Sequence, residues 1–196
     1  MVLAVRNVSV ERGYRRLLSG INLDIAPGEL WQIVGANGAG KTSLLRVLAG
    51  LVAIGVEGTV DCRVPTLYQG HALALKPLLT AQENLRYHPS GLGHLDPERI
   101  SHALAAVGLA GYEAHYLNQL SAGQQRRVGL ARLWLSDQPL WLLDEPFTAI
   151  DVKGAALLEV KISEHVAKGG SVIFTSHQES RFGTQVNVLD LAKYVV

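Results

Sequence analysis

Residues 35–42 form a glycine-rich segment, Gly-Ala-Asn-Gly-Ala-Gly-Lys-Thr, that fits the phosphate-binding pattern G-x-x-x-x-G-K-[ST]. The glycines allow successive backbone N–H groups to surround phosphate oxygens, and the start of the following helix adds its positive dipole end. We expect the Lys41 ammonium to reach the β- and γ-phosphates of a nucleoside triphosphate such as ATP, and the Thr42 hydroxyl to bind Mg²⁺. The predicted phosphate-binding residues are Gly35, Asn37, Gly38, Ala39, Gly40, Lys41, Thr42 and Ser43.

Two adjacent acids, Asp144 and Glu145, directly follow the apolar run Leu140–Leu143. The run predicts a buried strand, so both carboxylates are expected at the carboxyl end of a parallel sheet, where such sheets bind ligands. Asp144 is the predicted second Mg²⁺ ligand, and Glu145 is the predicted general base that accepts a proton from the attacking water. Either acid alone could instead cap the next helix.

The elements around these segments predict an α/β fold. Leu30–Val34 is a short apolar strand that leads into the glycine loop, and Thr42–Ala49 carries leucines at helical spacing before Gly50, a predicted C-terminal cap. Further strands are predicted at 21–25, 60–64, 140–143 and 171–175, with helices from Ser121 and over about 155–167. This alternation indicates a phosphate-loop NTPase core, a parallel sheet flanked by helices.

Residues from about 70 to 119 have a different pattern. Prolines and glycines gather between His88 and Pro97, and Asp96-Pro97 predicts the start of a helix that Gly108 ends. We interpret this stretch as a helical lobe inserted into a core formed by residues 1–69 and 120–196. The expected organisation is one domain over 1–196.

The composition narrows the possible functions. The net charge is +1, which gives no reason to expect a nucleic-acid partner. No apolar run reaches the roughly 18 residues of a membrane span, and the N-terminus lacks the pattern of a secretory signal. We therefore expect a protein on the cytoplasmic side of the cell membrane, soluble or peripheral. Cys62 is the only cysteine, so no intrachain disulfide is possible.

Leu120-Ser121-Ala122-Gly123-Gln124 resembles the signature LSGGQ of ABC-type ATPases, with Ala122 in place of the first glycine. Ser121 and Gln124 also fit a helix capping box, and both interpretations are compatible. The resemblance implies an ABC-type fold with an additional antiparallel β part. It also implies a homodimer with two shared sites, in which Ser121, Gly123 and Gln124 contact ATP held by the second copy.

Two further positions resemble functional residues of this family. Asp151 matches the loop that follows the two acids, and His177, after the predicted strand 171–175, matches the histidine that contacts the γ-phosphate. The resemblance therefore adds Asp151 to the nucleotide-contacting residues and His177 to the catalytic ones, Glu145 and Lys41. A histidine after a strand is otherwise more often structural.

Two family positions depart from the usual pattern. Where an aromatic ring usually stacks on adenine, this sequence has Arg12, with Tyr14 two residues later, and either could stack. The glutamine that usually senses the γ-phosphate and Mg²⁺ is also ambiguous. His71 matches the spacing, whereas Gln69 matches the chemistry two residues early, so both remain candidates.

Three stretches, beginning at residues 35, 70 and 120, are similar to a branch of the family, the ATPase subunits of the haem exporter of cytochrome c maturation. This resemblance implies integral membrane subunits as partners and a peripheral position at the cytoplasmic face of the inner membrane. The alternatives are the ATPase subunit of another ABC importer or exporter, and a soluble ABC-type ATPase. The soluble class usually has two ATPase modules or long coiled-coil insertions, which this chain lacks.

Overall fold

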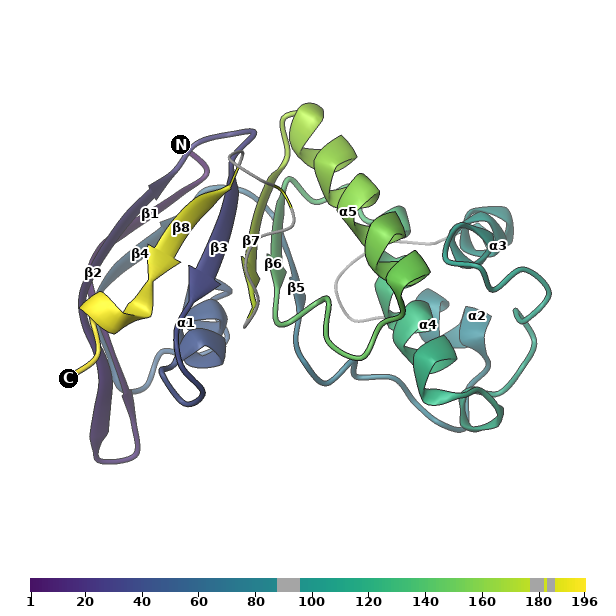
Figure 1. The fold of residues 1–196 in the computed structure, drawn as a ribbon, viewed down its shortest axis with the longest axis horizontal. Coiled ribbons are helices and arrows are strands. Elements are labelled where there is room, and N and C mark those ends of the chain that lie inside the picture. Colours follow the sequence, from purple (N-terminus) through teal and green to yellow (C-terminus); the bar gives the residue numbers. More distant parts are fainter. Residues whose placement is uncertain (88–95, 177–181, 183–185) are drawn as a thin grey trace. The chain divides into compact units, whose positions relative to one another are not determined.

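The computed structural model describes residues 1–87, 96–176, 182 and 186–196. Within it the chain divides into two compact units. The first comprises Met1–His71, Gln138–Pro146 and Ser163–Val196, and the second comprises Ala72–Asp137 and Phe147–Ile162. Each unit is described by itself below (Figure 1).

The first unit contains a three-stranded antiparallel sheet in the order β2-β1-β4. Its strands are β1 (Leu3–Arg12), β2 (Arg15–Ile25) and β4 (Val56–Cys62). Strand β2 contains the predicted strand 21–25, whose alternating apolar residues are buried. Strand β4 begins four residues before the predicted strand 60–64 and ends two residues before its end. The two-residue loop between β1 and β2 starts with Gly13 at φ 64°, a conformation that suits glycine.

A five-stranded parallel sheet in the order β5-β6-β7-β3-β8 forms the other layer of this unit. Strands β6 and β7 are buried along their whole length, as expected for apolar runs in the middle of a parallel sheet. These two strands and β3 confirm the predicted boundaries, whereas β5 and β8 were not predicted. The strands are β3 (Leu30–Val34), β5 (Thr66–Gln69), β6 (Leu140–Leu143), β7 (Ser171–Thr175) and β8 (Asn187–Asp190).

Helix α1 (Lys41–Leu48) follows β3 and packs between the two sheets. Its residues Leu44 and Leu45 are fully buried in one hydrophobic cluster with side chains from both sheets. Gly50 has φ 69° just beyond the helix, which confirms the predicted left-handed cap. The same core therefore fixes the direction in which the glycine loop leaves β3 and enters α1.

The second unit is helical. It contains α2 (Ala81–Arg86), α3 (Pro97–Ala106), a short 3-10 helix at Leu117–Gln119 and α4 (Ala122–Leu135). Helix α3 begins at the predicted Asp96-Pro97 start, where the Asp96 side chain accepts from the Glu98 N–H at 3.1 Å. These helices share a second hydrophobic cluster. The predicted single domain with a lobe at about 70–119 stays a prediction.

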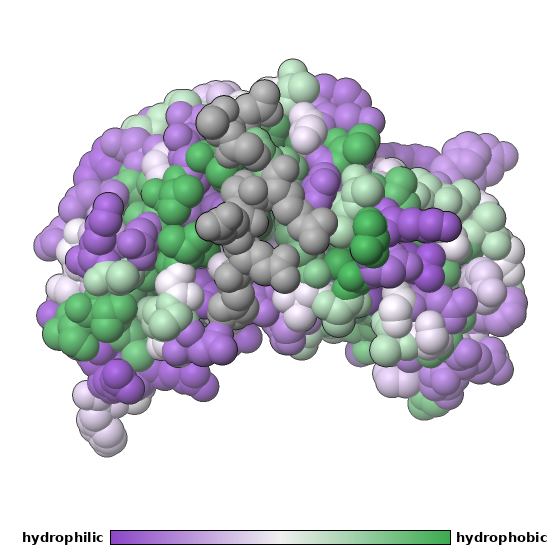
Figure 2. All heavy atoms as spheres, viewed as in Figure 1, coloured by the Kyte–Doolittle hydropathy of each residue, from purple (hydrophilic) through white to green (hydrophobic). Residues whose placement is uncertain are grey.

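The last of the boundaries between the units falls within α5 (Val152–Ala167), which begins three residues earlier than predicted. Hydrophilic residues cover much of the visible face of each unit, and hydrophobic residues show as separate patches (Figure 2). Among the helices of the described residues, none is long and apolar enough to cross a membrane.

Candidate functional site

The glycine loop between β3 and α1 is shaped by residues that few side chains could replace. Gly38 and Gly40 have φ 81° and 99°, in the left-handed region that favours glycine. A Cβ atom at Gly40 would also lie 3.1 Å from Cδ1 of Leu18, so the loop lies close against strand β2. Glycine is therefore required here both by conformation and by the close approach of another strand.

Lys41 begins helix α1 and folds back over the loop. Its Nζ atom donates to the carbonyl oxygens of Gly35 at 2.8 Å and Ala36 at 3.1 Å, and the residue is 6% exposed. Burial lowers the pKa of Lys41, while the carboxylates of Glu145 and Asp144 act in the opposite direction. The loop thus presents a partly desolvated cation beside backbone N–H groups, an arrangement that suits a phosphate chain.

Asp144 lies at the carboxyl end of β6 and is 2% exposed. The Thr42 hydroxyl donates to its carboxylate, with Oγ1 at 2.9 Å from Oδ2 and 3.1 Å from Oδ1. A second hydroxyl, from Thr175 at the end of β7, donates to Oδ1 at 2.8 Å. Thr42 and Asp144 therefore lie together and offer hard oxygen ligands of the kind that Mg²⁺ takes alongside phosphate and water.

Among the described residues, no group of three or more His, Cys, Asp or Glu residues could hold a metal ion. This is compatible with Mg²⁺, which is usually bound by one or two carboxylates together with substrate phosphates rather than by an all-protein cage. Thr42 and Asp144 are thus the residues that fit the predicted ion.

Glu145 follows Asp144 in an unusual backbone conformation, with φ 49°. Its backbone N–H donates to Thr175 Oγ1 at 2.8 Å, so one hydroxyl group connects the two acids. The Glu145 side chain is 19% exposed, and its Oε2 lies 3.7 Å from Nδ1 of His71. A largely buried carboxylate held in a strained position at a cavity is suited to general-base chemistry.

Sequence reasoning missed Thr175. The signal that could have found it is a polar residue directly after the apolar residues 172–174 of β7, beside the strand that carries the two acids. Its side chain is fully buried, and such a hydroxyl needs hydrogen-bond partners. The two acids supply them.

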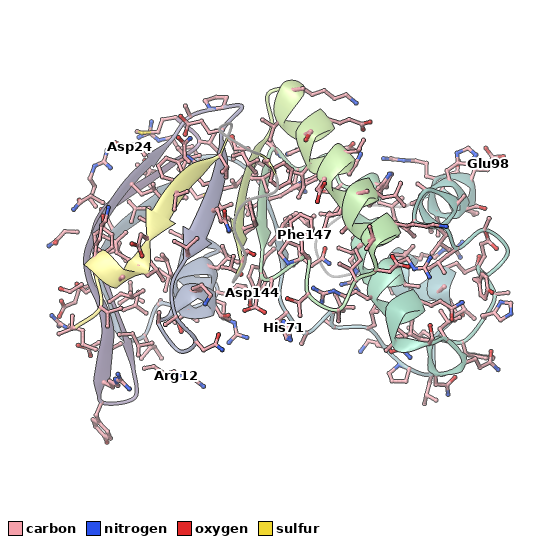
Figure 3. All side chains as sticks on the ribbon, viewed as in Figure 1. Arg12, Asp24, His71, Glu98, Asp144 and Phe147 are labelled. Atoms are coloured by element: carbon pink, nitrogen blue, oxygen red, sulfur yellow. The ribbon has the colours of Figure 1, made fainter. Side chains whose placement is uncertain are left out.

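A cavity of about 380 Å³ opens between the glycine loop and the β1–β2 hairpin, within the usual size range of small-molecule sites. Glu145 and the loop residues line one part, and Arg12, Arg15 and Leu17 of the hairpin line another. Tyr14, at the hairpin tip, is fully exposed and does not line the cavity. Figure 3 shows Arg12, Asp144 and His71 toward the same end of the first unit.

The two candidates for the γ-phosphate sensor occupy different environments. Tyr68 packs into the cluster that contains α1, so the alternation of strand β5 turns the side chain of Gln69 to the opposite face of the sheet. The Gln69 amide is buried, and neither Nε2 nor Oε1 has a hydrogen-bond partner among the described residues. His71 is instead exposed and lies beside Glu145. The structure therefore brings His71, and not the Gln69 side chain, to the acids.

The signature segment lies in the second unit, at the start of α4. The Ser121 side chain accepts from the Gln124 N–H at 3.3 Å, and the Gln124 side chain accepts from the Ser121 N–H at 2.9 Å. The predicted capping box is thus confirmed. Ser121 and Gly123 are exposed, which leaves this helix start accessible to an anion.

Two remaining predicted residues follow the acids in the sequence. Asp151, also in the second unit, is exposed, and its Oδ1 accepts from the Gly154 N–H at 2.8 Å near the start of α5. His177 lies outside the described residues. The described geometry thus assigns Asp151 a helix-capping contact.

Comparison with known proteins identifies relatives of this chain. Residues 18–148 match the family model described as ABC transporter. The chain is 48% identical over 190 residues to the "Cytochrome c biogenesis ATP-binding export protein CcmA" of Yersinia pestis, covering 91% of this chain and 87% of that protein. It is 48% identical over 192 residues to the protein of the same name from Vibrio vulnificus, covering 91% and 93%.

The fold is also shared with a solved structure. The dimeric ATP-binding cassette MJ0796, in a post-hydrolysis state bound to ADP and Pi, superposes with a TM-score of 0.81 at 26% sequence identity. The match covers 96% of this chain and 94% of that one. The similarity therefore extends over both the site-bearing unit and the helical unit.

Proposed function

This chain belongs to the ABC transporter family and is an ATP hydrolase, and on that basis we propose that it is the ATP-binding subunit of a haem-export complex of cytochrome c biogenesis. The observation that carries this proposal is the 48% identity to proteins named for that role, over 91% of the chain. Three sequence stretches, beginning at residues 35, 70 and 120, carry the resemblance to that branch.

Hydrolysis is assigned to the residues that meet at the carboxyl edge of the parallel sheet. The glycine loop and Lys41 bind the phosphate chain, and Thr42 and Asp144 hold Mg²⁺, which when bound offsets phosphate charge. Glu145 accepts a proton from the attacking water as general base. The separation of 3.7 Å between Glu145 Oε2 and His71 Nδ1 supports a positioning role for His71, next to the base.

The complete catalytic site is proposed to need a second copy of the chain. The helix start at Ser121 and Gly123 is exposed, and it offers N–H groups and a positive dipole end to an anion. In the proposed homodimer this helix start, with Gln124 and Asp151, faces the γ-phosphate of ATP bound by the other copy, together with His177 of the ATP-binding copy. The dimeric state of the similar cassette MJ0796 supports this arrangement.

The proposed partners of the dimer are integral membrane subunits, and its proposed location is the cytoplasmic face of the inner membrane, as a peripheral protein. ATP-driven closure and opening of the dimer would then supply the conformational change used for export. The alternatives are a different ABC importer or exporter and, third, a soluble ABC-type ATPase. These alternatives differ from the main proposal in the partner chains, not in the chemistry.

Complementation tests the proposal. The chain is expressed in a bacterium that lacks its own cytochrome c biogenesis ATPase, and c-type cytochromes are measured by haem staining. Wild type should restore them, Glu145→Gln should not, and Glu98→Gln, an exposed carboxylate at the start of α3, should restore them fully. If wild type hydrolysed ATP but restored no cytochrome, the haem-export role would be rejected in favour of another transporter.

A further inference from the structure

The β1–β2 hairpin carries four arginines that differ in their partners. Arg6 is paired with Asp24 at 2.7 Å. Arg16 is paired twice, with Glu11 at 3.0 Å and Glu57 at 2.9 Å, and these partners raise its pKa. Arg12 and Arg15 are exposed and line the nucleotide cavity. Neither Arg12 nor Arg15 forms a hydrogen bond or an ion pair with the described residues. Among the guanidinium groups of this hairpin, only the two that line the cavity therefore lack a carboxylate partner.

This difference follows from the register of the hairpin. Arg12 lies directly opposite Arg15, and Glu11 lies directly opposite Arg16. Because side chains alternate along a strand, Arg12 and Arg15 share one face with Leu17, and the Glu11–Arg16 pair occupies the other. Like charges in direct cross-strand contact are destabilising, so the Arg12–Arg15 pair stays unfavourable until a ligand binds.

The two ends of the cavity are lined by different groups. One part consists of the glycine loop and Lys41, which bind phosphate, so the base and ribose must extend toward the hairpin. Leu17 lies against the loop, because a Cβ atom at Gly40 would be 3.6 Å from the Leu17 Cβ. Arg12, Arg15 and Leu17 are therefore the lining residues available to the base.

Resting on the proposed nucleotide binding, we infer that Arg12 and Arg15 hold the base, and that this end of the cavity accepts guanine at least as well as adenine. A guanidinium offers only donors. One edge of guanine offers two acceptors, O6 and N7, which an arginine can contact together, whereas adenine offers N7 and a competing amino donor. The side chains lining the hairpin part provide no acceptor that would select the adenine amino group.

Equilibrium binding tests the inference, with ATP, GTP and inorganic tripolyphosphate as the three probes and with Mg²⁺ present. The main variant is the double substitution Arg12→Lys with Arg15→Lys, which keeps both charges but removes the planar, bidentate donors. The matched control is Arg16→Lys, on the opposite face of the same hairpin. Circular dichroism of each variant establishes that it is folded.

Wild type should bind GTP as tightly as ATP or more tightly. The double variant should lose about tenfold in GTP affinity, the size of one bidentate base contact, with a smaller loss for ATP and no loss for tripolyphosphate. Arg16→Lys should leave the ratio of GTP to ATP affinity unchanged. A wild-type preference for ATP of tenfold or more would overturn the inference while leaving the ATPase assignment intact.

Two other outcomes also decide against it. If the double variant lost tripolyphosphate affinity as strongly as GTP affinity, the arginines would bind phosphate rather than base. If wild type bound neither ATP nor tripolyphosphate, the nucleotide site itself would be rejected together with this inference. The tripolyphosphate measurement thus separates failure of the inference from failure of the proposed function.

Discussion

The carboxyl edge of the parallel sheet and the β1–β2 hairpin border the same cavity but are built in opposite ways. At the sheet edge, Asp144 and Thr175 are buried and bonded to each other, and the same Thr175 hydroxyl accepts the Glu145 N–H. At the hairpin, Arg12 and Arg15 are exposed and make no such bonds with the described residues. The first region is preorganised before the ligand arrives, and the second depends on the ligand for its partners.

This difference indicates which step each region controls. Groups fixed by buried hydrogen bonds need no reorganisation during reaction, so they suit the chemical step. Exposed, unpaired cations gain most when the ligand binds, so they suit affinity and selectivity. Substitutions at the sheet edge should therefore change turnover or folding stability, whereas substitutions at the hairpin should change nucleotide affinity.

The largest effect is expected for Glu145→Gln at the sheet edge. Removal of a general base costs typically about 10²- to 10⁴-fold in rate, whereas the amide keeps the shape of the side chain. Single-turnover hydrolysis and equilibrium ATP binding should be measured on the same protein. We expect turnover to be nearly abolished with ATP affinity retained; wild-type turnover would assign the base to another residue.

Lys41→Ala separates binding from chemistry within the same site. The substitution removes the cation that contacts the phosphates, so ATP affinity itself should fall, by at least the roughly tenfold worth of one charge-assisted hydrogen bond. Calorimetric titration with ATP and Mg²⁺ measures the change, and Lys153→Ala on the exposed start of α5 is the control. Unchanged affinity in Lys41→Ala would contradict the phosphate-binding role.

Thr175→Val tests the hydroxyl that connects the two acids. Valine has nearly the shape of threonine but removes the donor to Asp144 and the acceptor of the Glu145 N–H. Leaving buried polar groups without partners should lower the free energy of unfolding by about 1–3 kcal/mol, measured by urea denaturation, and should lower kcat as well. Thr175→Ser, which keeps the hydroxyl, should retain most of both. Equal stability of all three proteins would show that the connection is unimportant.

The sequence predicted the parts of the molecule that depend on local patterns. Continuous apolar runs predicted β3, β6 and β7, the glycine loop predicted the turn into α1, and the Ser121–Gln124 pair predicted the capping box. It did not predict the role of Thr175 or the opposite environments of Gln69 and His71. Those depend on which strands are neighbours and on which face of the sheet each side chain lies, and spacing along one strand does not determine either.

His71→Ala should have a smaller effect than the substitutions of the acids. The histidine is exposed and contacts Glu145 only at 3.7 Å, so it is expected to position the base rather than replace it. ATP binding by the isolated protein should persist, and the stimulation of ATPase activity in the assembled complex should fall. The decrease should be less than the roughly 10²-fold minimum typical of a lost general base. If His71→Ala changed neither ATP binding nor the stimulation of ATPase activity, His71 would have no role in the site.

Gln69→Met should have the smallest effect. It tests Gln69, the other candidate for the γ-phosphate sensor. Gln69 is 6% exposed, and its buried amide has no hydrogen-bond partner among the described residues, so the wild-type chain carries the desolvation cost of two polar atoms. Methionine has a similar length and removes both atoms. We therefore expect the free energy of unfolding to stay unchanged or to rise by about 1 kcal/mol, with ATP turnover unaffected. Gln69→Glu is the matched control, because it would bury a charge in the same place and should destabilise the fold. A large loss of ATP turnover in stable Gln69→Met would transfer the sensor role from His71 to Gln69.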